Sequence, residues 1–325
     1  MIVDPRLEAE LFTHGDTDER FVDRVFRHVL RRFPDDEARE RALAKLAEGT
    51  LSRATLIHEL TSSEEFARVR ELDDAAALGL GSRSRGERIR WLQAPPATDE
   101  RVVEIPWVLS RLVGEGRVLE VGYAFAEPAY LGSLLRAGVE LVGVDLATRD
   151  VGEMETVQAD VRELPFEDAS FDQALLVSTL EHVGADNSVY GLEAESDDGA
   201  RLRALRELGR VLRRRGSLLV TVPLGEPGDY GWFRQEDERG WTRLFARAGL
   251  FLHEVELYEL TSEGWRASPD LDTSDVRYGE RGPAASAVLC AELQPGRARR
   301  ALSPTGVRTV TRRRVGRAYR RARRL

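Results

Sequence analysis

The sequence predicts an α/β protein: a mostly parallel sheet of seven strands lies between helices, and a small all-α domain precedes it. Residues 18–70 have apolar side chains at helical spacing. From Arg101 onward, short apolar runs alternate with amphipathic segments, which is typical of β-α units around a parallel sheet. A chain of 325 residues with 42% hydrophobic side chains can build two such cores.

The chain divides by composition into four parts. Residues 1–75 form the predicted helical domain, in which Ser62 or Ser63 before two glutamates is typical of a helix start. Residues 76–100 are rich in Gly, Ser, Pro and charge and predict a linker. Residues 101–294 form the predicted α/β domain, and residues 295–325 form a basic, arginine-rich tail.

The helical part has the pattern FVDRVFRHVLRRFPDDEARERALAKLAEGTLSRATLIHELTSSEEFARVR. It resembles a small helical domain of unassigned function that occurs beside bacterial sugar-transferring enzymes and in some secreted repeat proteins. A packing module without chemistry is the alternative interpretation.

The α/β part contains seven apolar segments with strand composition. They are residues 117–122, 141–147, 156–161, 171–179, 217–223, 251–260 and 284–293. Helical periodicity is found at residues 130–137, 201–212 and 236–248. Because the last two strands lack a clear helix between them, we expect the seventh strand to run antiparallel to the others.

Three consecutive strands end in residues suited to bind a nucleoside. Small residues at Gly122, Ala124 and Ala126 let the backbone approach a ligand after the first strand. Asp145 follows about 20 residues later, where a carboxylate can accept hydrogen bonds from both ribose hydroxyls. Asp160 ends the third strand. Each aspartate alone can equally be an ordinary strand-end cap, but the set indicates one ligand site.

The motifs VLEVGYAFAEPAYL, GVDLA, QADVRELPFEDASFDQALLVSTLEHV and LRELGRVLRRRGSLLVTVP resemble the class I S-adenosylmethionine-dependent methyltransferases, of the type 11 kind, over residues 101–293. The resemblance implies a Rossmann-like fold and S-adenosylmethionine as the cofactor. It also implies the cofactor-binding positions: Glu120, Gly122, Tyr123, Ala124 and Ala126 near the methionine, Asp145 and Leu146 at the ribose, Asp160 and Val161 at the adenine, and Ser178 and Thr179 near the sulfonium.

Two departures from that family leave an alternative open. Ala124 and Ala126 stand where the family usually has glycine, so a catalytically inactive scaffold in a glycan-assembly system is the second hypothesis. A nicotinamide enzyme is disfavoured, because Ala124 and Glu127 stand where the Gly-x-Gly-x-x-Gly turn has its second and third glycines, and a carboxylate repels a pyrophosphate.

Methyl transfer needs alignment and, for a hydroxyl acceptor, a base. His182, after the fourth strand, is the predicted catalytic base; a packing role within its loop is the alternative. The two loops after the fourth and fifth strands contain the predicted substrate-binding residues, which can hold a polar, ring-shaped acceptor such as a sugar or glycan precursor. These residues are Asp186, Tyr190, Tyr230, Trp232 and Arg234. Plain surface roles are the alternative.

Composition excludes several other classes. Cys290 is the only cysteine and the five histidines lack ligand spacing, so no metal is expected. The tail contains twelve arginines and no acid; because the whole chain carries a net charge of −8, the preceding residues carry −20. Nucleic acid is not expected as a partner, because an acidic body repels phosphates.

No apolar stretch is long enough for a membrane span or signal peptide, which predicts a cytoplasmic protein. The tail has the pattern of a basic amphipathic helix that can contact an anionic membrane face; a solvated tail is the alternative.

Overall fold

The computed structural model describes residues 17–95, 99–152, 154–192 and 196–296. The chain divides into two compact units, Met1–Asp74 and Ala75–Leu325. The boundary between them lies within one helix, α5 (Glu64–Ser84). The predicted basic tail lies outside the described residues from position 297 onward.

The first unit is helical, as predicted. It contains α2 (Asp18–Val29), α3 (Asp36–Ala47), α4 (Arg53–Thr61) and the beginning of α5. Side-chain oxygens cap the helices: Asp35 accepts a hydrogen bond from the Ala38 amide at 2.8 Å, and Ser63 accepts one from the Phe66 amide at 3.1 Å. The apolar stripes meet in one small core, which includes Phe21, Val25, Val29, Leu56 and Ile57.

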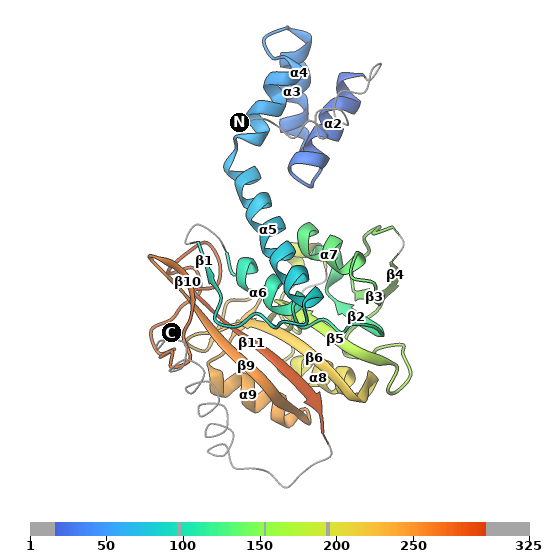
Figure 1. Cartoon of the computed structure of the whole chain (residues 1–325), viewed down its shortest axis with the longest axis vertical. Coiled ribbons are helices and arrows are strands. Elements are labelled where there is room, and N and C mark those ends of the chain that lie inside the picture. Colours follow the sequence, from blue (N-terminus) through green and yellow to red (C-terminus); the bar gives the residue numbers. More distant parts are fainter. Residues whose placement is uncertain (1–16, 96–98, 153, 193–195, 297–325) are drawn as a thin grey trace. The chain divides into compact units, whose positions relative to one another are not determined.

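The second unit is built on one large sheet, shown in Figure 1. Its strands are β1 (Gln93–Ala94), β2 (Arg117–Val121), β3 (Glu140–Asp145), β4 (Glu155–Gln158), β5 (Phe171–Val177), β6 (Leu212–Pro223), β9 (Leu250–Thr261), β10 (Gly264–Ala267) and β11 (Ala287–Pro295). They are ordered β1-β10-β9-β11-β6-β5-β2-β3-β4. All seven predicted strands are present in the sheet, so the predicted fold class is confirmed.

The strand directions also match the prediction. Strands β4, β3, β2, β5 and β6 pair in parallel, whereas β11 pairs antiparallel with both β6 and β9. The sheet is larger than predicted within the described residues, because β10 and β1 extend it beyond β9. A separate two-stranded ribbon, β7 (Gly228–Asp229) and β8 (Arg234–Gln235), follows β6.

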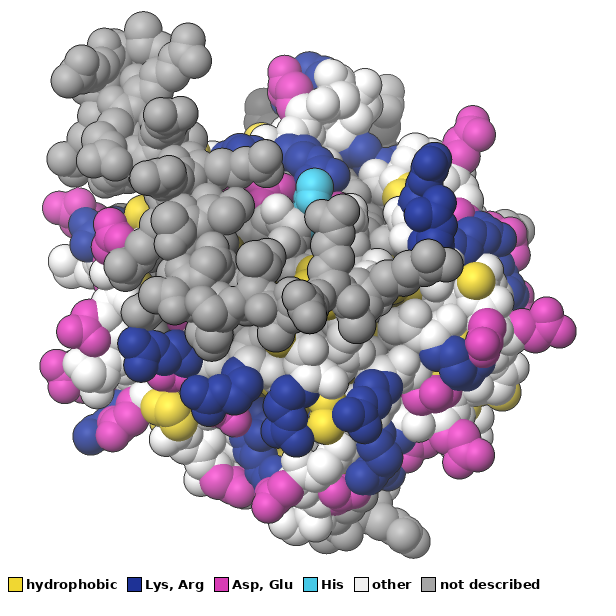
Figure 2. Space-filling model, turned by 90° about the horizontal axis from the view of Figure 1, so that it is seen from below, with side chains coloured by type: hydrophobic (Ala, Val, Ile, Leu, Met, Phe, Trp, Pro, Cys, Tyr) yellow, Lys and Arg dark blue, Asp and Glu magenta, His cyan; other side chains and the backbone are white. Residues whose placement is uncertain are grey.

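Helices cover both faces of the sheet (Figure 1). On one face lie α6 (Arg101–Leu109) and α7 (Pro128–Leu135), and on the other α8 (Ala200–Val211) and α9 (Glu238–Arg247). The main core lies between the sheet and α8 and α9, and contains Leu176, Leu205, Val220, Trp241 and Phe245. The outer faces of α8 and α9 are polar; Figure 2, seen from that side, shows arginine and acidic side chains mixed with few hydrophobic ones.

The predicted linker at residues 76–100 is corrected by the structure. Its first part, up to Ser84, is the second half of α5, where Gly79 lies so close to α6 that a Cβ would come within 2.9 Å of the Pro106 backbone. The Arg83 guanidinium donates to the carbonyls of Leu112 and Ala137, at 3.1 and 2.8 Å. The later part contributes β1 to the sheet. The Gly, Ser and charge content of this segment therefore serves close packing and carbonyl capping.

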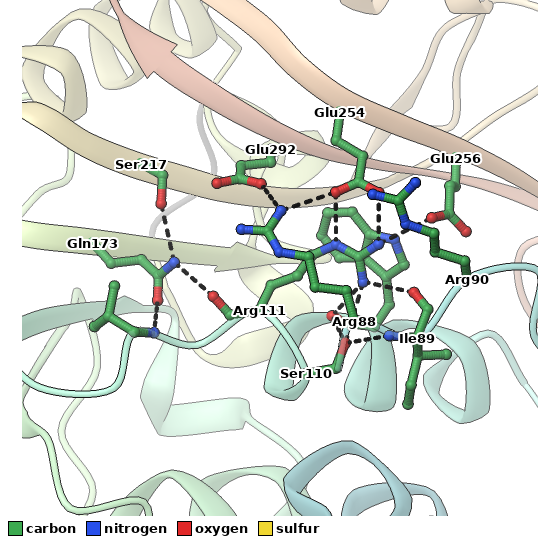
Figure 3. A network of polar contacts seen from close by, with 12 residues as sticks. Arg88, Ile89, Arg90, Ser110, Arg111, Gln173, Ser217, Glu254, Glu256 and Glu292 are labelled. Carbon is green, nitrogen blue, oxygen red and sulfur yellow. Dashed lines mark hydrogen bonds and ion pairs between the residues drawn. The ribbon is translucent and has the colours of Figure 1, made fainter. Parts of the chain in front are cut away.

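A partly buried ionic network joins this segment to the last strands (Figure 3). The fully buried Arg111 guanidinium donates to Glu254 and Glu256 at 3.0 and 2.9 Å, and lies 4.0 Å above the Trp107 ring. Arg88 pairs with Glu254 and Glu292. Arg90 also pairs with Glu254, so the network contains three arginines and three glutamates and its formal charges balance. The ion pairs compensate the free-energy cost of removing these charged groups from water.

Candidate active site

A cavity of about 210 Å³ lies beyond the carboxyl ends of β2, β3, β4 and β5. Its lining includes Gly122 after β2, Asp145 at the end of β3, and Asp160 after β4. These three positions were predicted to surround one nucleoside, and the structure brings them together. Eleven predicted site residues line the cavity: Glu120, Gly122, Ala126, Asp145, Leu146, Asp160, Val161, Ser178, Thr179, His182 and Tyr190.

Asp145 is held rigidly at the cavity wall. Its Oδ2 accepts a hydrogen bond from the Ala124 amide and its Oδ1 one from the Ala147 amide, both at 3.0 Å. Burial raises the pKa of this carboxyl, against the opposing effect of those amides. Because each carboxylate oxygen has a further lone pair, Asp145 can still accept two hydrogen bonds from a ligand.

Asp160, which the resemblance places at the adenine, is paired with Arg162. Its carboxylate receives the Arg162 guanidinium on both oxygens, with Nε at 3.0 and 2.9 Å, and the Arg162 amide at 2.7 Å. Burial alone would raise its pKa, but the bonds and charge of Arg162 hold the pKa below its ordinary value. Arg162 itself lines the cavity. The sequence analysis did not predict it as a site residue.

The turn after β2 depends on Gly122. Its φ is +92°, and a Cβ there would lie 2.6 Å from Thr179 Oγ1. Thr179 cannot retreat easily, because its hydroxyl donates to the Val177 carbonyl at 2.9 Å.

We expect Gly122→Ala to lower the free energy of unfolding by about 2–3 kcal/mol, of which ~1 kcal/mol comes from the positive φ and the rest from displacing Thr179. Gly138→Ala is the matched control, because Gly138 has φ +72° and a Cβ added there would meet no atom of the described chain within 4 Å. Urea unfolding measures both. Equal losses in the two variants would contradict the close contact with Thr179.

The residues after Gly122 differ in burial and in role. Tyr123 is buried, and its ring packs on the strand residue Gly143, where a Cβ would approach the ring to 2.8 Å. Neither Ala124 nor Ala126 has a positive φ; Ala126 has φ −64°. The alanines that replace the family's glycines are therefore free of backbone strain. Ala124 contributes its amide to Asp145, and Ala126 lines the cavity.

Glu120 is a buried carboxyl at the inner end of the cavity. It is 1% exposed, and the Tyr130 hydroxyl donates to its Oε2 at 2.8 Å. Burial raises the pKa of Glu120 to about 8. At neutral pH the side chain is therefore mostly protonated, and a cation bound beside it would favour its ionised form.

Helix α6 places two further charged side chains, Arg101 and Glu104, near the inner end of the cavity. Arg101 lines the cavity, and its Nη1 lies 2.6 Å from Glu104 Oε2. Glu104, with its side chain fully buried, also accepts from the Ser178 hydroxyl at 2.8 Å. Ser178 has φ +41°, an unfavourable conformation for a non-glycine residue that is typical of functional sites. This Arg101, Glu104 and Ser178 arrangement fixes a guanidinium at the cavity wall.

His182 presents one ring nitrogen as a proton acceptor. Its Nδ1 lies 2.9 Å from the Trp232 carbonyl oxygen, which can only accept, so Nδ1 carries the hydrogen and Nε2 has the free lone pair. Burial lowers the pKa of His182 to about 4, so the ring is neutral at pH 7. The ring stacks on Trp232 at 5.1 Å and lies 5.6 Å edge-on from Tyr190.

The predicted substrate-binding residues separate into two groups. Tyr190 lines the cavity, and Trp232 contacts the cavity residue His182. Asp186, Tyr230 and Arg234 are not part of the described lining. Arg234 is buried and paired with Asp198 at 2.6 Å, and Tyr230 stacks on Phe233 at 4.6 Å. Their contact with an acceptor stays a prediction.

Within the described residues, no cluster of His, Cys, Asp and Glu could hold a metal ion. The same described part of the chain contains no helix with the length and apolar character needed to cross a membrane.

Comparison with known proteins agrees with this geometry. Residues 119–220 match a family described as a methyltransferase domain, and residues 8–69 match a domain of unknown function, DUF4214. The predicted resemblance to the S-adenosylmethionine-dependent methyltransferases is confirmed, and the cofactor that it implies agrees with this family.

Several solved structures are similar to the chain. The 1,6-didemethyltoxoflavin-N1-methyltransferase from Burkholderia thailandensis, solved with S-adenosylhomocysteine, is 15% identical, with 85% of this chain and 91% of that chain covered and a TM-score of 0.41. A SAM-dependent methyltransferase from Methanosarcina mazei is also 15% identical, with 58% and 97% covered and a TM-score of 0.40. The YcgJ protein from Bacillus subtilis is 16% identical, with 57% and 94% covered and a TM-score of 0.36.

Proposed function

We propose that the protein is an active methyltransferase that binds S-adenosylmethionine in the cavity beyond Gly122. One observation carries this proposal: Glu120, Asp145 and Asp160, from three neighbouring strands, line a single cavity together with Arg101. This set of groups fits the ligand, since it offers a carboxyl for an ammonium, a carboxylate for a diol and a guanidinium for a carboxylate.

Each part of the cofactor has a candidate partner. Asp145 would accept from the ribose hydroxyls, while Leu146 and Val161 offer apolar contact to the adenine. Arg101 would bind the methionine carboxylate and Glu120 its ammonium. When bound, the cofactor supplies a methyl group on a positively charged sulfur, which an aligned nucleophile can accept.

His182 is the residue that we propose as the base. Its neutral ring, with Nε2 free to accept, can take a proton from the acceptor as the methyl group is transferred. The Nδ1 bond to the Trp232 carbonyl keeps the ring in that tautomer. The rings of Tyr190 and Trp232 beside it support a ring-shaped acceptor such as a sugar or glycan precursor.

An inactive scaffold is less well supported. That alternative expects an occluded cofactor pocket, with Ala124 and Ala126 strained or Tyr123 filling the space. Instead, the alanines have ordinary backbone angles and Tyr123 packs on Gly143. We retain the cytoplasmic location, the peripheral membrane contact of the tail and the absence of a nucleic-acid partner as proposals.

Calorimetric titration of the full chain with S-adenosylmethionine and S-adenosylhomocysteine tests the function. Binding of both at micromolar concentration is expected. Absence of heat for either ligand, with the fold intact by circular dichroism, would contradict the proposal.

The affinity for S-adenosylhomocysteine is expected to depend on pH through Glu120. Its pKa of about 8 means that the carboxyl is protonated at pH 6, and a bound ammonium favours the ionised form. Binding should therefore release a proton, and the affinity should rise with pH by up to about tenfold per unit below pH 8. Above roughly pH 8 the ligand's own α-amino group loses its charge, so the affinity should fall again.

Titrations between pH 6 and 9 measure this effect, and adenosine is the control ligand because it lacks the amino acid part. Its affinity should stay flat with pH. Glu120→Gln should remove the rise for S-adenosylhomocysteine; a profile unchanged in that variant would show that another group titrates.

A further inference from the structure

The cavity is bordered by more acid than the cofactor and Arg101 require. Glu100, Glu104 and Glu181 are buried, at 8%, 0% and 4% exposure, and the one guanidinium that interacts with all three is Arg101 among the described residues. Burial raises the pKa of Glu181 to about 8, and burial with neighbouring carboxyls raises that of Glu100 to about 7. Ionising all three would leave a net negative charge that nothing described neutralises.

Glu181 differs from the other two carboxyls in its hydrogen bonding. Glu104 accepts from Ser178, and Glu100 accepts from the Ala285 amide at 3.2 Å. Glu181 Oε2 is buried and has no hydrogen-bond partner among the described residues. An unsatisfied buried carboxyl oxygen costs about 1–3 kcal/mol, so such an atom in a native structure indicates a missing partner.

Several neighbours of Glu181 line the cavity, although Glu181 itself is not part of the described lining. The next residue, His182, lines the cavity, and its Nε2 lies 3.9 Å from Glu181 Oε1. The carboxyl also interacts electrostatically with Arg101 and Tyr190, which both line the cavity. Glu181 thus borders the part of the cavity that His182 and Tyr190 line.

A cluster of aromatic rings lies near this acidic position. Tyr190 lies 4.9 Å from Phe125 and 6.4 Å from Trp232, and Trp232 lies 6.2 Å from Tyr278. Tyr278 interacts electrostatically with Glu100 and Glu181, so its ring belongs to the same cluster. Aromatic faces beside a buried carboxylate are the surroundings that a positively charged nitrogen prefers.

We propose that the acceptor atom is an amine nitrogen, received as an ammonium by Glu181 and the rings of Tyr190, Trp232 and Tyr278. This inference rests on the proposed function and narrows its acceptor from a hydroxyl to an amine, including an amino group on a sugar. The ammonium supplies the missing donor for Glu181 Oε2 and favours the ionised form of that carboxyl. A neutral hydroxyl would supply the donor but would not favour the ionised form.

The chemistry balances with the groups present. The ammonium passes one proton through His182 Nε2 to the ionised Glu181, 3.9 Å away, because the pKa of Glu181, about 8, lies above that of His182, about 4. The freed nitrogen lone pair then forms the new N–C bond, while the electron pair of the broken C–S bond stays on sulfur. The products are a methylated ammonium and neutral S-adenosylhomocysteine.

Binding of matched amine and alcohol probes tests the proposal. The full chain is saturated with S-adenosylhomocysteine and titrated at pH 7.5 with benzylamine against benzyl alcohol, and with methyl glucosaminide against methyl glucoside. We expect at least one amine to bind tenfold or more tightly than its hydroxyl partner. Glu181→Gln should remove this preference, and Glu181→Asp should restore part of it.

Glu100→Gln is the matched control, because it removes a buried carboxyl of the same cluster that already has a partner. It should keep most of the preference. Equal loss in Glu100→Gln and Glu181→Gln, or no preference for any amine in the wild type, would overturn the proposal. So would a Glu181→Gln variant that loses affinity for S-adenosylmethionine but not for S-adenosylhomocysteine, because the carboxylate would then serve the sulfonium. Failure of the wild type to bind S-adenosylhomocysteine would instead contradict the proposed function itself.

Discussion

Replacing Asp145 by alanine is expected to weaken S-adenosylmethionine binding by at least about 100-fold. Two hydrogen bonds from ribose hydroxyls to a charged acceptor are together worth about 3 kcal/mol, which corresponds to roughly that factor. The substitution also removes the acceptor for the Ala124 and Ala147 amides, so the turn that shapes the cavity loses its fixation. Calorimetric titration measures the loss.

The neighbouring Asp150→Ala is the control for this experiment. Asp150 is exposed and accepts a local hydrogen bond from the Gly152 amide at 3.0 Å. Its replacement should leave the affinity within about threefold of the wild type, as expected for a surface change. Asp145→Asn keeps one acceptor oxygen and should give an intermediate loss. A normal affinity in Asp145→Ala would remove the ribose assignment.

His182→Ala is expected to lower methyl transfer about 100-fold while leaving cofactor affinity within about threefold. A positioned base contributes roughly 10²–10⁴ to the rate, and alanine removes the one neutral nitrogen that His182 offers to the cavity. The measurement follows isotope-labelled methyl groups into acceptors of a cell extract by mass spectrometry, where each product gains one CH2 unit.

His253→Ala is the matched control, because His253 is an exposed histidine on β9. It should transfer label at the wild-type rate. If His182→Ala retained that rate as well, the histidine would have only its packing role between Trp232 and Tyr190. A loss of S-adenosylhomocysteine affinity in His182→Ala would likewise indicate a structural role.

Much of the α/β core could be predicted because its residues follow simple periodic rules. A buried parallel strand has a continuous apolar run, and its carboxyl end must reach the ligand edge of the sheet. That rule was enough to place Gly122, Asp145 and Asp160 in one site from the order of the strands alone. The helical first unit was predictable for the same reason, since its apolar stripe and serine caps are local features.

Helix α6 could not be predicted by the same rules. Eight of its nine residues are buried, so its sequence lacks an amphipathic period, and Pro106 stands inside it. As a consequence, Arg101 and Glu104 were missed, although an arginine and a glutamate three positions apart in an apolar run were a readable signal. Arg162 was missed because its bond to Asp160 depends on a side-chain conformation, and the role of Glu181 depends on which partners it lacks.

The ionic network around Arg111 constrains the order in which the molecule can be completed during translation. Arg88 and Arg111 leave the ribosome early, whereas their carboxylate partners Glu254 and Glu292 are encoded 143 to 204 positions later. Until those residues emerge, these guanidinium groups have to remain hydrated. The network therefore cannot be completed before residues 250–295, which form β9, β10 and β11, have been synthesised.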